Sequence, residues 1–204
     1  MAIPTPVLVI ATRNPGKRRE FAELFAGLPI DLQDLSSFPD APIVEERHDT
    51  YLANAHDKAL TIGRFTGLPA LADDSGLEVD ALGGQPGVRS ARYAGNSASD
   101  RDNIDLLLRT LHGTPDAERS ARFRCVIVVA LPNGDTLQSE GVCEGRIARQ
   151  ASGMSGFGYD PVFYYPPAKS TFAELAGAEK NRVSHRARAC QRLRPQLLDF
   201  LRRA

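Results

Sequence analysis

The sequence lacks the features that mark several large classes of protein. It has three cysteines among 204 residues. Because their number is odd and their spacing fits no metal site, we expect no disulfide framework and a reducing, cytoplasmic setting. No apolar run approaches the length of a membrane span, and the first six residues carry no basic region of a signal peptide. We therefore expect no membrane partner.

The chain also lacks an excess of either charge. Lys plus Arg and Asp plus Glu both number 25, so the formal net charge is zero. General binding to a nucleic acid polymer favours a strongly basic protein, and we expect no such partner. An RNA-binding module would need a basic face, which this balance does not favour.

The composition is that of an ordinary globular domain, with 42% hydrophobic and 25% charged residues. A chain of this length can bury a substantial core without disulfides. It contains no internal repeat, no low-complexity segment and no linker that divides it cleanly. We therefore expect residues 1–204 to form a single domain, organised as two lobes.

Hydrophobic patterns predict strand–helix units early in the chain and a long hairpin late in it. Helices are expected to begin near Asn14, at Asp49 or Thr50, at Ser97 or Ser99, and at Ser184. The turn residues 132–135 predict the hairpin. The predicted strands are residues 7–11, 30–35, 69–72, 122–131 and 136–147. This mixture predicts an α/β fold, with two lobes around a mixed β-sheet, flanking helices and the active site in the central cleft.

Two adjacent carboxylates provide the strongest chemical signal. The apolar run Leu68–Ala72 predicts a buried strand that ends in Asp73 and Asp74. Packing explains such a pair poorly, because burying an unpaired charge is unfavourable; capping of the following turn is the structural alternative. Mg²⁺ prefers oxygen ligands, and one carboxylate can bind it while the other deprotonates water. The pair therefore fits metal-assisted hydrolysis of a phosphate.

Two further segments are suited to binding phosphate. Thr12–Lys17 lies where a strand becomes a helix, and helix N-terminal amides together with Lys17 attract anions. This segment is not a Walker A loop, and a capped helix with a surface lysine is its structural alternative. Asn54 and Lys58 are four residues apart on one helix face, which suits a phosphate-facing pair and a plain exposed face equally.

Other segments gain a function only if the fold brings them to the aspartates. Glu45 and Glu46 follow a proline-rich stretch, and two acids in a loop are usually solvated. If they meet the aspartate pair, a metal ion would relieve the repulsion between the carboxylates.

In residues 155–161, aromatic side chains between glycines predict stacking on a nucleobase, with a packed hydrophobic plug as the alternative. His185 and Arg186 open a helix, where the dipole disfavours cations, and this hints at an acceptor-rich ligand.

Taken together, these segments resemble the inosine triphosphate pyrophosphatase family, the XTP/dITP diphosphatases. The resemblance extends from Val7 to about Ala189. The matching motifs are Thr12-x-Asn14-x-x-Lys17, Asn54-Ala55 with Lys58, Ala72-Asp73-Asp74-Ser75-Gly76-Leu77, Gly83-Gly84-x-Pro86-Gly87, Ser90-Ala91-Arg92-Tyr93, Gly156-Phe157-Gly158-Tyr159-Asp160-Pro161-x-Phe163, Glu179-Lys180-Asn181 and Ser184-His185-Arg186.

The resemblance implies two α/β lobes around a long mixed sheet, a homodimer, and Mg²⁺-dependent hydrolysis of dITP, ITP or XTP to the monophosphate and pyrophosphate. It implies catalysis by Asp74, Asp73 and Lys17, and a metal site from Asp74 with Glu45 or Glu46. The implied substrate-binding residues are Thr12, Arg13, Asn14, Pro15, Gly16, Lys17, Lys58, Ser75, Phe157, Gly158, Tyr159, Asp160, Lys180, His185 and Arg186.

The chain departs from the family at one position and leaves other functions open. Bacterial members commonly have Glu before the Asn-Ala pair, where this chain has Ala53. If that Glu served the metal, Glu45 or Glu46 must suffice here, and the sequence does not decide between them. A nucleotide-binding regulator would not need Asp73, Asp74 and Lys17 together. A Maf-type pyrophosphatase would lack the segment 184–186.

Overall fold

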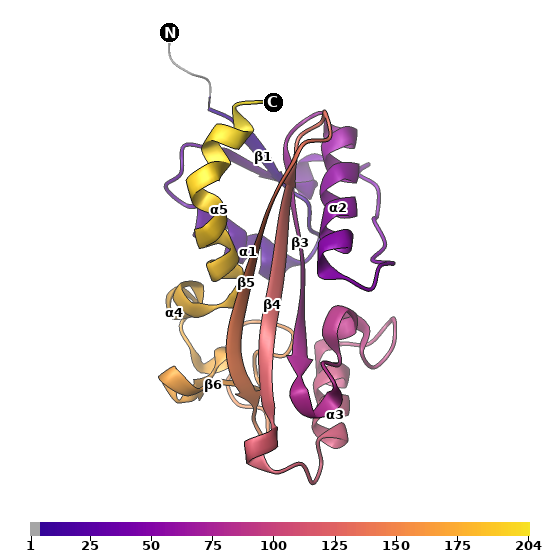
Figure 1. Cartoon of the computed structure of the whole chain (residues 1–204), viewed down its shortest axis with the longest axis vertical. Coiled ribbons are helices and arrows are strands. Elements are labelled where there is room, and N and C mark those ends of the chain that lie inside the picture. Colours follow the sequence, from indigo (N-terminus) through magenta and orange to yellow (C-terminus); the bar gives the residue numbers. More distant parts are fainter. Residues whose placement is uncertain (1–4) are drawn as a thin grey trace. The chain divides into compact units, whose positions relative to one another are not determined.

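The structure is a computed structural model that describes residues 5–204 (Figure 1). The chain divides into two compact units, each built from separate stretches of sequence. Unit 1 comprises the residues up to Asp74 together with Cys125–Gly141 and Arg186–Ala204. Unit 2 comprises Ser75–Arg124 and Val142–His185. The location of an active site in a cleft between two lobes stays a prediction.

Within residues 5–204, the strands belong to one seven-stranded sheet with the order β2-β1-β3-β4-β5-β6-β7. β1 pairs in parallel with β2 and β3, whereas β5–β6 and β6–β7 pair antiparallel, so the predicted mixed α/β sheet is confirmed. The strands are β1 Val7–Ile10, β2 Asp31–Asp34, β3 Ala70–Val79, β4 Ser120–Ala130, β5 Thr136–Ile147, β6 Phe163–Tyr165 and β7 Ser170–Thr171. The predicted turn at 132–135 joins β4 to β5, its neighbour in the sheet.

The helices begin where their capping residues were predicted. Asn14 caps α1 and precedes Pro15, Thr50 caps α2, and Ser99 caps α3 in a capping box with Asp102. The helices are α1 Pro15–Phe25, α2 Tyr51–Thr66, α3 Asp100–Thr110, α4 Gly177–Val183 and α5 His185–Leu201. The sequence patterns missed α4, β6 and β7. No helix formed by residues 5–204 is long and apolar enough to cross a membrane.

In unit 1, helices cover both faces of the sheet (Figure 1). One core cluster joins Leu71 of β3 to apolar side chains of α1 and α5. The other joins Ala70 and Ala72 to Ala55, Ala59 and Ile62 of α2. Leu52, in the first turn of α2, is not part of this cluster and is 41% exposed.

The prediction that a strand ends at the aspartates is also wrong. β3 continues through Asp73, Asp74, Ser75 and Gly76 as far as Val79. Ser75-Gly76 resembles a turn signal, but β3 lies between β1 and β4 in the sheet, and pairing with a neighbouring strand overrides local preference. The two carboxylates therefore lie inside a buried strand.

Candidate active site

Asp73 and Asp74 point to opposite faces of the sheet in unit 1, because successive side chains alternate along a strand. Asp73 shares its face with Leu71, which packs with α1 and α5. Asp74 shares its face with Ala72, which packs with α2. Both residues are only 2% exposed. Since an isolated buried carboxylate is strongly disfavoured, each of them needs compensating partners.

Two cations compensate Asp73. Its Oδ2 accepts from Lys17 Nζ at 3.1 Å and from Arg186 Nη2 at 2.9 Å. Arg186 also binds Glu20 of α1, and the Arg186 side chain is 1% exposed. Burial opposes the charged guanidinium, but the carboxylates of Asp73 and Glu20 outweigh it and raise the pKa of Arg186. The Asp73 carboxylate is thereby paired with two cations, and it holds Lys17 in place.

Lys17 lies in the first turn of α1, which the chain enters through a tightly bonded segment. Asn14 Oδ1 accepts from the Lys17 backbone N–H at 3.0 Å, and Thr12 Oγ1 accepts from the Asn14 N–H at 3.2 Å. Pro15 and Gly16 complete this turn, and Gly16 is buried. Arg13 Nη2 donates to the carbonyl oxygen of Ala41 at 2.7 Å, so its described contact is with the protein.

Asp74 has a mixed environment on the α2 side. Its Oδ2 accepts from Asn54 Nδ2 at 2.9 Å. Burial and the charge of Glu46 raise the pKa of Asp74, and the charges of Lys58 and Lys17 only partly offset this. Asp74 is therefore the member of the pair whose environment favours taking up a proton.

Lys58 connects the Glu46 loop to β3. Its Nζ donates to Glu46 Oε1 at 2.7 Å and to the carbonyl oxygen of Asp73 at 2.6 Å. Burial disfavours the ammonium, but the charges of Glu46, Asp73 and Asp74 outweigh it and raise the pKa of Lys58. Lys58 therefore stays charged beside the carboxylates.

The two glutamates predicted as metal ligands have different surroundings. Glu46 reaches the aspartates through Lys58, whereas Glu45 pairs with Arg47 and its side chain is 69% exposed. Across the part of the chain that the structure describes, no three or more His, Cys, Asp or Glu side chains form a group that could hold a metal ion. The geometry thus favours Glu46 over Glu45 as the companion of Asp74.

The predicted base-recognition residues of unit 2 form their own bonded cluster. Asp160 Oδ2 accepts from Lys180 Nζ at 2.5 Å and from the Phe157 N–H at 2.9 Å, and Lys180 Nζ lies 4.9 Å from the centre of the Phe157 ring. The Tyr159 hydroxyl donates to the Ser90 carbonyl oxygen, and the Gly158 N–H donates to Asp100. These bonds tie the loop to neighbouring segments of unit 2, with Phe157 half-buried and Tyr159 buried.

The last predicted substrate-binding residues lie next to these clusters in the sequence. His185 stacks on Phe123 in unit 2, with ring centroids 4.6 Å apart. Ser75 follows Asp74 in β3 and is partly exposed. Arg186 contacts two carboxylates of the protein, so a role for it in recognising a base stays a prediction.

Sequence reasoning assigned no role to Glu20 and left Asn54 undecided, although both contact the candidate site. The available signal was helical spacing: Glu20 is three residues after Lys17, and Asn54 is four before Lys58. That spacing places each residue on a shared face but does not name its partner. The partners, Arg186 and Asp74, lie 166 and 20 residues away in the sequence.

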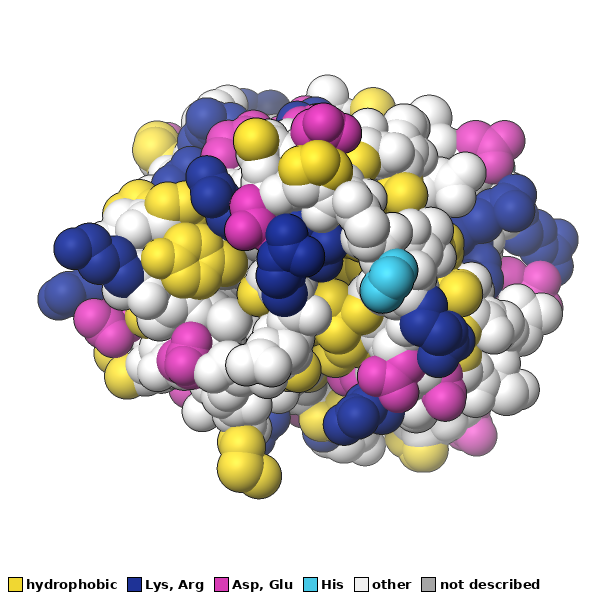
Figure 2. All heavy atoms as spheres, turned by 90° about the horizontal axis from the view of Figure 1, so that it is seen from below, with side chains coloured by type: hydrophobic (Ala, Val, Ile, Leu, Met, Phe, Trp, Pro, Cys, Tyr) yellow, Lys and Arg dark blue, Asp and Glu magenta, His cyan; other side chains and the backbone are white. Residues whose placement is uncertain are grey.

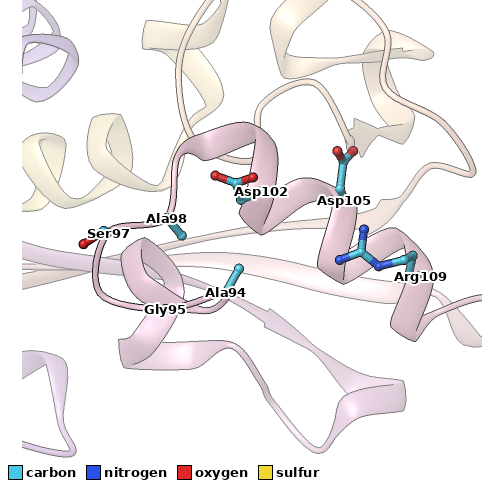
Figure 3. Close-up of a pocket in the computed structure, with 7 residues that line it drawn as sticks. All are labelled: Ala94, Gly95, Ser97, Ala98, Asp102, Asp105 and Arg109. Carbon is cyan, nitrogen blue, oxygen red and sulfur yellow. The ribbon is translucent and has the colours of Figure 1, made fainter.

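A pocket of about 500 Å³ lies elsewhere, at the start of α3 (Figure 3). Both carboxylates of its lining are already bonded within the protein: Asp102 completes the cap with Ser99, and Asp105 pairs with Arg101. The face shown in Figure 2 carries basic and acidic side chains interspersed with one another. This view agrees with the zero net charge and gives the RNA-binding alternative no support.

Comparisons with known proteins find relatives along almost the whole chain. A sequence model of the Ham1 family matches residues 8–196. A dITP/XTP pyrophosphatase from Geobacillus kaustophilus is 52% identical over 189 residues, which are 93% of this chain and 93% of that protein. One from Geobacter sulfurreducens is 50% identical over 190 residues, 93% of this chain and 96% of that protein.

Solved structures show the same arrangement. A HAM1 protein from Coxiella burnetii has a TM-score of 0.86 and 43% identity, and the match covers 95% of this chain and 99% of that chain. The Ham1 protein from Staphylococcus aureus has a TM-score of 0.83 and 39% identity, with the same coverage of 95% and 99%. These matches confirm the fold and the family predicted from the motifs.

Proposed function

The chain belongs to the Ham1 family, and from this premise we propose that it hydrolyses the non-standard purine nucleotides dITP, XTP and ITP. The products are the nucleoside monophosphate and pyrophosphate, so the enzyme cleanses the nucleotide pool. The proposal is supported by relatives of about 50% identity that carry the name dITP/XTP pyrophosphatase. The observation that carries it is the convergence of Lys17, Lys58 and Glu46 on Asp73 and Asp74 in unit 1.

The triphosphate is assigned to the entry of α1. Residues 12–17 present the first amides of that helix, and Lys17 adds a full positive charge that Asp73 orients. Lys58 adds a second cation near the same carboxylates. Together these groups offset part of the negative charge on the nucleotide and on the leaving pyrophosphate.

The residues present fit Mg²⁺ bound together with the substrate. Mg²⁺ is usually held by one or two carboxylates plus substrate phosphates. Glu46 and Asp74 supply two carboxylates, and their charges disfavour each other, since Glu46 raises the pKa of Asp74. When bound, the ion supplies charge neutralisation at the phosphates.

Asp74 is proposed as the group that takes the proton in the reaction. A water oxygen attacks the α-phosphorus, the bond between this phosphorus and the bridging oxygen to the β-phosphorus breaks, and pyrophosphate leaves. The water proton passes to Asp74, whose raised pKa suits a general base. Asp73 is the weaker candidate for this role, because its carboxylate is paired with Lys17 and Arg186 and is less available to accept a proton.

Recognition of the base is proposed for residues 157–160 together with Lys180, His185 and Arg186, as the family resemblance implies. Hypoxanthine and xanthine carry an oxygen at the purine 6-position, where adenine carries an amino group. A site built of donors discriminates strongly against a ligand that leaves them unpaired. We also propose a homodimer, which a measurement of molar mass in solution will test.

The decisive experiment is a panel of dITP, ITP, XTP, GTP and ATP with detection of pyrophosphate, with and without Mg²⁺. We expect Mg²⁺-dependent pyrophosphate release from dITP and XTP, and at least roughly a hundredfold loss of kcat in Asp74→Asn, the usual effect of removing a general base. Equal efficiency with ATP would contradict the assigned specificity. Binding without turnover would instead indicate a nucleotide-binding regulator, and full activity of Asp74→Asn would refute the role of Asp74.

A further inference from the structure

The side-chain amide of Asn54 makes three hydrogen bonds inside unit 1. Its Oδ1 accepts from the backbone N–H of His48 at 2.9 Å, and its Nδ2 donates to the carbonyl oxygen of His48 at 3.1 Å. The same Nδ2 donates to Asp74 Oδ2 at 2.9 Å. Asn54 is 1% exposed, so these bonds form away from water. One amide thus binds both backbone groups of a loop residue and a carboxylate on β3.

The loop that Asn54 holds carries the two glutamates. Residues 40–47 contain no helix or strand, and Glu45 and Glu46 lie within this stretch. Arg13 anchors its beginning through the carbonyl oxygen of Ala41. Asn54 anchors its end at His48, directly after the glutamates and Arg47. The loop is therefore fixed on both sides of Glu46.

We infer that Asn54 is a positioning residue, which locks the Glu46 loop and Asp74 to one another and so sets the spacing of their two carboxylates. The inference rests on the proposed function, in which Glu46 and Asp74 act together. It assigns Asn54 no contact with the nucleotide.

Asparagine is suited to this task by its chemistry and its length. The side chain supplies one carbonyl acceptor and two N–H donors, and all of these are used here. Aspartate has the same shape but no donor when ionised, and alanine has neither group. Glutamine keeps the amide but moves it by one methylene. Asn54→Ala and Asn54→Gln therefore separate the presence of the amide from its position.

Proteolysis can report on the loop without any turnover. The peptide bond between Arg47 and His48 is a trypsin site, and the Arg47 side chain is 77% exposed. The two bonds from Asn54 hold the His48 backbone on the C-terminal side of this peptide bond. The rate of cleavage there is measured by mass spectrometry relative to cleavage after Arg149, an exposed site of unit 2. A variant that is merely less stable raises both rates, whereas loss of the anchor raises their ratio.

We expect this ratio to rise at least roughly tenfold in Asn54→Ala and in Asn54→Gln, since two hydrogen bonds to one peptide are lost or displaced. Asp57→Ala is the matched control. It removes the 2.6 Å contact of Asp57 with the His48 side chain and leaves the backbone bonds intact. Its ratio and its kcat should stay within about twofold of the wild-type values.

In the kinetic arm, kcat for dITP should fall at least roughly tenfold in both Asn54 variants, with a smaller change in KM, because the carboxylates are displaced while Lys17 is not. If the wild type releases pyrophosphate and Asn54→Ala keeps both its cleavage ratio and its kcat within twofold, the inference is overturned. An equal rise of the ratio in Asp57→Ala would overturn it as well. If the wild type releases no pyrophosphate from any nucleotide, the proposed function fails, and the cleavage ratio still decides whether Asn54 holds the loop.

Discussion

Replacing Arg186 by methionine would leave two carboxylates of unit 1 without their shared cation. The side chain of Arg186 is 1% exposed, that of Asp73 is 0% exposed and that of Glu20 is 12% exposed. Removing one partner of such a buried group typically destabilises a protein by about 3–5 kcal/mol, because an uncompensated charge remains. Lys17 still contacts Asp73 at 3.1 Å, so we expect the lower end of this range, about 3 kcal/mol.

Urea unfolding measured by circular dichroism provides the assay, with the slope checked for constancy between variants. Arg18→Met is the matched control on α1, because Arg18 pairs with Asp34 while both side chains are about one-third exposed. Such a pair contributes about 0–1 kcal/mol. In a background carrying Glu20→Gln and Asp73→Asn, Arg186→Met should be neutral or stabilising, because it removes a buried guanidinium that has lost both of its carboxylate partners. A loss below about 1 kcal/mol in the single variant, or an undiminished loss in that background, would refute the reasoning.

Two further predictions concern pH and backbone conformation. Hydrogen bonds from the Ser36 side chain and backbone lower the pKa of Asp34, with help from Arg18. Relative to Asp34→Asn, the Asp34 carboxylate should therefore stabilise the folded state by about 0.5–1.5 kcal/mol. This stabilisation is present above the unfolded pKa of about 3.8 and is lost as the pH falls through the lower folded pKa. Urea unfolding from pH 7 to pH 2 checks this, and a difference in stability between the two proteins that widens in acid would contradict it. Gly153 has φ +83° and its Cβ would lie 2.4 Å from the Ala173 backbone, whereas Gly113 has φ +84° and open space around it. Gly153→Ala should therefore be less stable than Gly113→Ala by about 1–3 kcal/mol. Thermal unfolding measures both variants, and an equal loss of stability in the two would show that the contact between the new Cβ and the Ala173 backbone is relieved.

The elements that could be predicted from the sequence are those that nearby residues determine. β1 follows from a β-branched apolar run, and α1 follows from Asn14 and Pro15 in capping positions. The turn at 132–135 carries its own signal and joins β4 to β5. The missed elements are short: β6 has three residues, β7 has two and α4 has seven. Segments of that length carry too little periodicity to distinguish them from a loop.

The candidate site could be predicted only by residue type and not by partner. Asp73, Asp74 and Lys17 stand out because buried carboxylates and a lysine at a helix start need an explanation. The different surroundings of the two aspartates do not appear in the sequence, because they depend on which face of β3 each one occupies. The choice of Glu46 over Glu45 depends on Lys58, twelve residues further along the chain.

The pairing of Asp73 with Arg186 joins residues 113 positions apart, and unit 1 needs the final stretch Arg186–Ala204 to be complete. On the ribosome, the nascent chain therefore exposes β3 and its acids long before the cation that compensates them has been translated. Unit 2, whose last residue is His185, can finish folding first. A stop codon or a frameshift at the start of the last tenth of the message would consequently spare most of the chain and still remove the activity.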